Sequence, residues 1–176
     1  LIPLYNPAAQ GFDAYVDANL VSTLPNDDDN VLLIVPTQGG AELRRVNVNT
    51  ADATTVDRGT LFTFNWEVDV NGTPVLRQDS VGNGRGYAWL RRGPGQRNWT
   101  EIATYRGAEG VNSAPAFSPL GAATQPGQVF VSARRDGSDT NALYVYDAST
   151  GEYTHTVQTN ASFDVSPRML LQGGAT

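Results

Sequence analysis

The stretch Asn141–Thr156, NALYVYDASTGEYTHT, has the pattern of a β-strand, a tight turn and a second β-strand. Its first part, residues 142–146, is rich in aromatic and β-branched residues, and residues 147–151 (DASTG) are typical turn formers. Strand character returns at residues 153–157. The stretch is therefore predicted to form a β-hairpin.

The same pattern occurs 100 residues earlier in the chain. The matched pairs are Leu43 and Leu143, Val46 and Tyr146, Asn47 and Asp147, Thr50 and Thr150, Asp52 and Glu152, and Thr54 and Thr154. This separation is twice about 50 residues, which is the length of one blade of a β-propeller. The recurrence therefore indicates a repeat protein.

Composition agrees with a folded all-β chain. The 176 residues are 40% hydrophobic and 17% charged, which is typical of a globular domain with a core of its own. Eighteen glycines and ten prolines, with many Asn, Asp, Ser and Thr, indicate frequent turns between short apolar runs.

The predicted strands group into three units of four, each about 45–50 residues long. The first unit, residues 13–58, has strands at 13–24, 31–35, 42–48 and 53–57. The second, 61–106, has strands at 61–67, 74–78, 87–91 and 99–105. The third, 111–159, has strands at 114–117, 128–133, 142–146 and 153–158, with a loop at 118–127. Residues 161–166 are expected to begin a fourth unit, after an extended lead-in (1–12) and before a flexible tail (167–176).

Three local patterns support these strands. Residues 31–35 (VLLIV) are apolar throughout, as in a strand buried on both faces. Phe62, Phe64 and Trp66 alternate with polar residues, which predicts one apolar face with period two. Asn71-Gly72 predicts a type I′ hairpin turn, in which both central residues have positive φ. The fold class is thus predicted as a partial β-propeller, with a β-sandwich as the alternative because turns every 8–12 residues suit both.

Charge and composition exclude several functions. The net charge is −6, and all 12 basic residues are arginines without a continuous basic stripe, so nucleic acid is not an expected partner. The pairs Arg44-Arg45, Arg91-Arg92 and Arg134-Arg135 are each interpreted as one exposed and one edge-facing arginine.

No stretch reaches 18 apolar residues, so no membrane partner is expected. The chain has no cysteine, which excludes disulfides but does not decide the compartment; the bacterial periplasm is slightly preferred to the cytoplasm.

Several segments resemble the N-terminal propeller of serine peptidases of the prolyl-oligopeptidase type, in particular bacterial dipeptidyl- and acylaminoacyl-peptidase-like proteins. The segments are LPNDDDNVLLIVP, ELRRVNVNTADATTVDRG, WEVDVNGTPVLRQ, NWTEIATYRG, NALYVYDASTGE and SFDVS. Together they span most of residues 13–165. The strand–turn motif of that family usually has glycine where this chain has Ala51, so the resemblance implies a turn of a different type there. In that family a propeller of seven or eight blades lies over an α/β-hydrolase domain that carries a Ser-Asp-His triad. The resemblance implies that this chain is a fragment of such a propeller, and that the triad lies beyond Thr176.

The chain itself has no complete catalytic machinery. It lacks the G-x-S-x-G motif that exposes a nucleophilic serine, and its one histidine, His155, is interpreted as a surface strand residue. The run Asp27-Asp28-Asp29 lacks the spacing of a Ca²⁺ loop and is interpreted as a solvated turn. No metal and no cofactor are predicted.

Three residues are candidates for substrate binding. Trp66 lies on a first strand, and first strands line the central channel of a propeller. Arg134 and Arg135 end a second strand, where a guanidinium could bind a peptide carboxylate.

Two functions follow from the sequence. In the first, this chain gates and helps bind peptide substrate for a parent peptidase, and its partners are the missing blades and the hydrolase domain, or further copies of itself. In the second, it is a stand-alone β-rich module that binds proteins or glycans.

Overall fold

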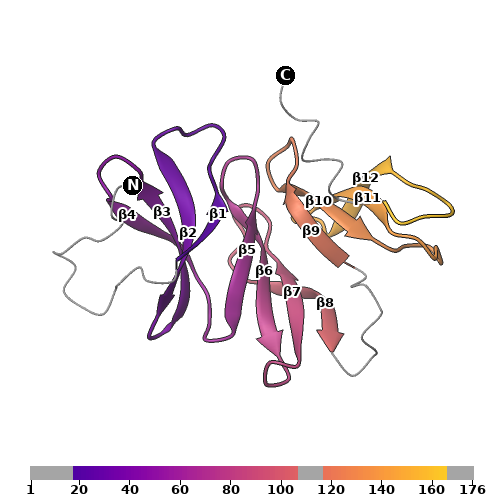
Figure 1. The fold of residues 1–176 in the computed structure, drawn as a ribbon, viewed down its shortest axis with the longest axis horizontal. Coiled ribbons are helices and arrows are strands. Elements are labelled where there is room, and N and C mark those ends of the chain that lie inside the picture. Colours follow the sequence, from indigo (N-terminus) through magenta and orange to yellow (C-terminus); the bar gives the residue numbers. More distant parts are fainter. Residues whose placement is uncertain (1–17, 107–116, 166–176) are drawn as a thin grey trace.

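The computed structural model describes residues 18–106 and 117–165, which form three four-stranded antiparallel sheets (Figure 1). The first sheet contains β1 (Asn19–Ser22), β2 (Asn30–Thr37), β3 (Gly40–Asn47) and β4 (Ala53–Arg58). The second contains β5 (Thr63–Val68), β6 (Pro74–Val81), β7 (Gly86–Arg91) and β8 (Thr100–Arg106). The third contains β9 (Phe117–Ala122), β10 (Gln128–Ala133), β11 (Ala142–Asp147) and β12 (Glu152–Gln158).

Each sheet is a meander in which neighbouring strands in sequence are hydrogen-bonded. The prediction of an all-β chain with three four-stranded antiparallel units is confirmed. None of the described residues lies in a helix, so this part of the chain contains no helix that is long and apolar enough to cross a membrane.

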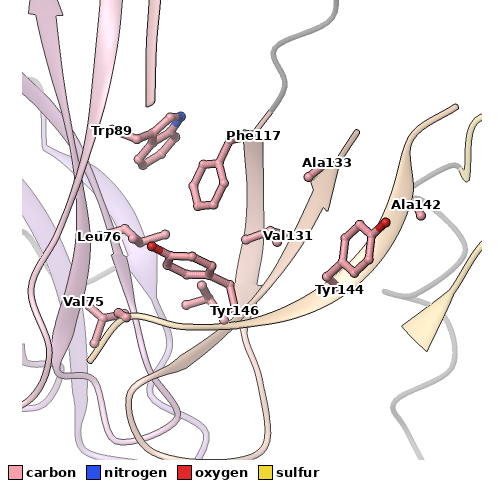
Figure 2. Packing of buried hydrophobic residues seen from close by; sticks show 11 residues of the cluster. Val75, Leu76, Trp89, Phe117, Val131, Ala133, Ala142, Tyr144 and Tyr146 are labelled. Atoms are coloured by element: carbon pink, nitrogen blue, oxygen red, sulfur yellow. The ribbon is translucent and has the colours of Figure 1, made fainter. Parts of the chain in front are cut away.

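The second sheet lies between the other two, and an apolar cluster fills each interface. Between the first and second sheets, the cluster contains Leu24, Leu32, Ile34, Leu43, Trp66 and Val68. Between the second and third sheets, a larger cluster includes Val75, Leu76, Trp89, Phe117, Val131, Tyr144 and Tyr146 (Figure 2). The first strand of the second sheet, β5, contacts both β1 and β9, the first strands of its neighbours. The three sheets therefore meet along their first strands (Figure 1).

Strand β2 is buried on both faces, as its apolar run predicts. Leu32 and Ile34 pack toward the second sheet. Leu33 and Val35 belong to a separate cluster with Val46 on the opposite face of the first sheet. Because side chains alternate between the faces of a strand, a two-sided environment requires an unbroken apolar sequence.

The repeated hairpins match closely in their turns. The Oδ1 atom of Asn47 accepts hydrogen bonds from the backbone N–H groups of Asn49 and Thr50, at 2.9 and 3.0 Å. Asp147 Oδ1 accepts the corresponding bonds from residues 149 and 150, at 2.8 and 3.3 Å. Ala51 has a φ of 62° and Gly151 a φ of 82°. The expectation of a different turn at Ala51 is therefore wrong, since the alanine adopts the left-handed conformation of the glycine.

The β5–β6 turn also differs from its prediction. Gly72 has a positive φ of 76°, but Asn71 does not have a positive φ, so the turn is not of type I′. Instead, Asp69 Oδ1 accepts hydrogen bonds from the N–H groups of Asn71 and Thr73, both at 2.9 Å. A carboxylate that holds these two amides fixes a longer turn, in which only Gly72 needs the left-handed region.

Strand boundaries in the third sheet need two corrections. Residues 118–122, expected to be a loop, belong to β9 and pair with β10. Residues 161–166 were expected to begin a fourth unit, but residues 161–163 form bends, residues 164–165 have no regular structure, and residue 166 lies outside the described residues. The predicted lead-in at 1–12 and tail at 167–176 lie outside the described residues.

The Arg91-Arg92 pair links all three sheets. Arg91 Nη1 donates to the carbonyl oxygens of Ala148 and Ser149 in the third sheet, at 2.7 and 2.9 Å. Arg92 Nη2 forms an ion pair with Asp57 Oδ1 of the first sheet, at 3.0 Å. Adjacent strand residues do point to opposite faces, but both faces of β7 are covered. The interpretation of this pair as one exposed and one edge-facing arginine is therefore wrong.

Candidate functional site

The start of the second sheet exposes a short apolar segment. Leu61, Phe62 and Phe64 have 74%, 62% and 48% of their surface exposed, and we call these three residues the β5 apolar strip. On the neighbouring first strand β1, Leu20 is also exposed. Single exposed apolar side chains are common on protein surfaces, but large ones that cluster, as here in the turn before β5 and at its start, mark a candidate contact surface.

A β-bulge explains why Phe64 is exposed while Trp66 is buried. The register between β5 and β6 shifts between Thr63 and Asn65, so Phe64 lies at an irregular position without a regular partner. A bulge breaks the alternation of side chains at that point. The predicted apolar face of Phe62, Phe64 and Trp66 is therefore divided: the two phenylalanines are exposed, whereas the indole enters the core.

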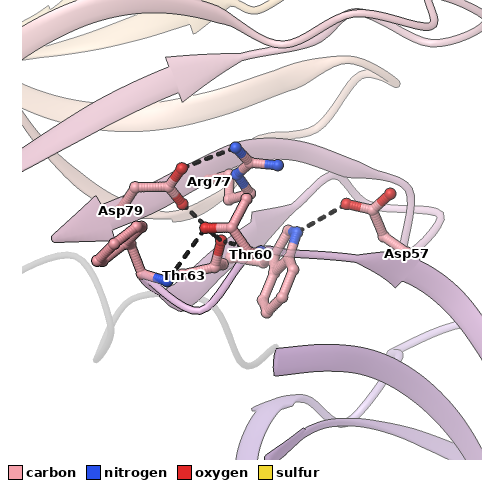
Figure 3. A network of polar contacts seen from close by, with 7 residues as sticks. Asp57, Thr60, Thr63, Arg77 and Asp79 are labelled. Carbon is pink, nitrogen blue, oxygen red and sulfur yellow. Dashed lines mark hydrogen bonds and ion pairs between the residues drawn. The ribbon is translucent and has the colours of Figure 1, made fainter. Parts of the chain in front are cut away.

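A polar network behind the strip fixes its backbone (Figure 3). The backbone N–H of Phe62 donates to Thr60 Oγ1 at 3.1 Å, and that of Thr60 donates to Thr63 Oγ1 at 2.9 Å. Thr63 Oγ1 in turn donates to Asp79 Oδ1 at 2.7 Å. Asp79 Oδ2 completes the chain through an ion pair with Arg77 at 2.7 Å. These linked bonds hold residues 60–63 in one conformation.

The strip is also tied to the first sheet. The N–H of Gly59 donates to the carbonyl of Ala41 at 2.9 Å, and the N–H of Ala41 donates to the carbonyl of Thr60 at 3.4 Å. A β-carbon at Gly59 would lie only 2.6 Å from Cβ of Thr63, so this approach requires glycine. The strip is therefore presented on a rigid connection.

Trp66, predicted to face a substrate, is instead a core residue. Its side chain is 1% exposed, and its Nε1 donates to Asp57 Oδ2 at 2.9 Å. Asp57 also binds Arg92, whose guanidinium lies 4.2 Å from the ring centroid of Trp99. In this structure the prediction for Trp66 is not supported, because its indole joins the first and second sheets and offers no free surface.

Arg134 and Arg135 follow β10 in the third sheet. The guanidinium of Arg135 lies over the rings of Tyr153 and Tyr144, at 4.2 and 5.6 Å from their centroids. Arg134 is exposed. Cation–π stacking holds Arg135 in place without using its N–H donors, so a role for either arginine in carboxylate binding stays a prediction.

Glu67 is a feature that sequence reasoning missed. It pairs with Leu76 across β5 and β6, so both side chains point to the face that packs against the third sheet. Burial on this apolar face raises the pKa of Glu67 to about 7, although a 3.4 Å hydrogen bond from Asn65 Nδ2 lowers it. Its place in an alternating strand resembles that of any solvent-facing polar residue, so no local sequence pattern distinguishes it.

Other candidate residues have structural partners. Asp27 accepts a hydrogen bond from Asn30 Nδ2 at 2.8 Å, and Asp29 accepts one from Asn49 Nδ2 at 2.9 Å. Within residues 18–106 and 117–165, no group of three His, Cys, Asp or Glu residues is placed to hold a metal ion. His155 is exposed on β12, as the sequence predicts.

The fold and site define an all-β protein of three stacked sheets with an exposed apolar strip at the start of its middle sheet. No protein-family model, curated protein or solved structure matches the chain.

Proposed function

We propose that this chain is a non-catalytic β-propeller segment that binds peptides, and that in its parent protein it gates an α/β-hydrolase domain of the serine-peptidase type. The observation that carries the proposal is the side-by-side placement of β1, β5 and β9, with the β5 apolar strip exposed at the start of the middle one. In a propeller the first strands of the blades line the central channel, where a substrate passes.

The chemistry of the strip suits an extended peptide. Phenyl rings offer large apolar surfaces at a low entropic cost, and they contact apolar side chains of many shapes. The rigid polar network beneath them means that little further ordering is needed on binding, which favours affinity. We therefore assign the strip to apolar side chains of a peptide.

Binding of an apolar peptide tests this assignment directly. A fluorescein-labelled peptide rich in Leu and Phe is titrated with the wild-type chain, and fluorescence anisotropy is measured. Replacing both Phe62 and Phe64 with serine should weaken binding about tenfold or more, since each removed phenyl contact contributes about 1 kcal/mol or more. Phe163→Ser is the matched control, because Phe163 is 72% exposed outside the three sheets. Equal losses in both variants would contradict the assignment.

The parent enzyme is tested separately. Sequencing the gene on either side of this segment should reveal a G-x-S-x-G motif followed by an aspartate and a histidine. A fluorophosphonate probe should label the full-length protein, while this 176-residue chain stays unlabelled. If the gene encodes no hydrolase domain but the strip binds peptide, the chain is a stand-alone β-rich binding module instead.

We further propose that other propeller sheets, or a second copy of the chain, pack beside the outer sheets. Each blade of a propeller packs against two neighbours, whereas among the sheets formed by residues 18–106 and 117–165 only the second has both. Multi-angle light scattering should then show association that increases with concentration. A monomer at every concentration reached would contradict self-association.

A further inference from the structure

A groove of about 370 Å³ lies between the first and second sheets, apart from the β5 apolar strip. It is lined by Arg45 on β3 and Val56 on β4 from the first sheet. The second sheet contributes residues 71–74, around the β5–β6 turn, and the glycine-rich connection after β7, residues 92–96. The groove is therefore built by three segments that are distant in sequence.

Its lining residues include two arginines and no carboxylate. Arg45 Nη1 pairs with Asp27 Oδ2 at 3.3 Å, and the Arg45 side chain is 37% exposed. Arg92 pairs with Asp57 through Nη2, and its guanidinium is stacked on the Trp99 ring. Since a guanidinium has five N–H donors, each ion pair occupies only part of the available set.

Both guanidinium groups are held by neighbouring groups. A β-carbon at Gly72 would lie 2.4 Å from Leu24 Cδ2, so this position requires glycine, and Arg45 Nη2 lies at contact distance from it, 3.4 Å from the same β-carbon position. Arg92 is held on two sides, by Asp57 and by the Trp99 ring. Side chains with restricted motion lose little entropy when they bind a ligand, which is the condition for a preorganised site.

We propose that this groove binds a carboxylate group of a peptide. Guanidinium groups match carboxylates in geometry and form charge-assisted hydrogen bonds with them. Each arginine is already partly neutralised by one aspartate, so the groove suits a single negative charge better than the multiple charges of a nucleic acid or polyphosphate. The groove lies apart from the β5 apolar strip, so carboxylate binding there does not require the proposed propeller function.

The carboxylate could be a peptide's C-terminus or an Asp or Glu side chain, and three small ligands distinguish these sources. They are acetyl-Ala-Ala-Ala with a free C-terminus, its C-terminal amide, and acetyl-Ala-Glu-Ala-amide. Titration of the ¹⁵N-labelled wild-type chain by NMR should show saturable shifts of the backbone amides of Gly72, Gly93 and Gly95. If the groove binds a C-terminal carboxylate, only the free acid should cause these shifts. If it also binds carboxylate side chains, the glutamate peptide should cause them as well.

Arg45→Gln tests the contribution of the guanidinium. It should weaken binding of the active carboxylate ligand about tenfold, which corresponds to the loss of one charge-assisted hydrogen bond. The matched control is Arg85→Gln, which makes the same change of charge on the exposed β6–β7 turn and should change affinity less than about twofold. Binding of the fully amidated peptide at equal strength would overturn the proposal. Equal losses in the two variants, or no saturable shift with either acid, would also overturn it.

Discussion

At the scale of single residues, the repeat is clearest at Ala51 and Gly151. Both close a turn by donating their N–H to the carbonyl four residues earlier, at 2.9 and 2.8 Å. Both have a positive φ, but only glycine adopts this conformation without steric cost. The first turn therefore has the geometry of the second, but with a steric cost at Ala51 that substitution by glycine would remove.

Replacing Ala51 with glycine should stabilise the chain by about 0.5–1 kcal/mol, because the relief of left-handed strain exceeds the entropic cost of glycine. The reverse change, Gly151→Ala, should destabilise it by about 2 kcal/mol. At Gly151 a β-carbon would also lie 2.8 Å from Nε of Arg91, which holds the third sheet. Urea denaturation of both variants checks the opposite signs, and two losses of similar size would contradict the shared geometry.

Glu67 gives the chain a specific dependence on pH. Its pKa is about 7 in the folded chain and near 4.5 when unfolded, since burial disfavours the charged form. Below pH 4.5 both states bind the proton and there is no penalty. As the pH rises, the unfolded chain releases the proton first, so stability falls between about pH 4.5 and pH 7 and stays lower above that.

The size of this loss is about 3 kcal/mol, and Glu67→Gln should abolish it because glutamine does not ionise. The variant should match the wild type near pH 4.5 and exceed its stability at pH 8. Glu152→Gln, an exposed carboxylate on β12, serves as the control and should leave the pH profile unchanged. The measurement is the free energy of unfolding in urea at a series of pH values. A wild-type profile that is flat between pH 4.5 and 8 would disprove the role of Glu67.

At the scale of elements, a single buried carboxylate joins two turns from different sheets. Asp69 is 2% exposed, and its Oδ1 holds the β5–β6 turn. Its Oδ2 accepts a hydrogen bond at 2.8 Å from the N–H of Gly127, in the β9–β10 turn. This residue therefore fixes the geometry within the second sheet and the position of the third sheet at the same time.

Asp69→Asn should separate these two roles. The amide keeps one oxygen for the local turn but presents an NH₂ group to the Gly127 N–H, so two donors face each other and the link between the sheets is lost. The expected cost is about 2 kcal/mol, as for a buried bond to a charged group. Asp147→Asn is the control and should be nearly neutral, because Asn47 performs the same task in the first sheet. Equal effects of the two substitutions would show that the link to Gly127 contributes nothing.

At the scale of the whole molecule, the sequence predicts what is local and misses what is distant. The three four-stranded units were predictable because turn residues and strand composition act over a few positions. The hydrogen bond between Asp69 and Gly127 joins residues 58 positions apart, and no local sequence pattern predicts it. The bulge at Phe64 likewise depends on pairing with β6. Because of it, Phe62 and Phe64 are exposed, whereas Trp66, the residue predicted to be accessible, is buried. Neither the burial of Glu67 nor the covering of both faces of β7 follows from strand alternation alone.

The three tryptophans report separately on the two interfaces between the sheets. Trp66 belongs to the cluster between the first and second sheets and Trp99 packs against it, whereas Trp89 lies between the second and third sheets. The chain is labelled with 5-fluorotryptophan, and the ¹⁹F resonances are assigned by single Trp→Phe variants and followed through a urea titration. In stacked repeats, stability depends on contacts between neighbours, so a weakened interface should open first. In the wild type, the three folded signals should disappear together, because both interfaces have extensive apolar clusters.

With Asp69→Asn, the Trp89 signal should disappear at a lower urea concentration than those of Trp66 and Trp99. If all three midpoints shift by the same amount, the sheets unfold as one unit and Asp69 contributes only to global stability.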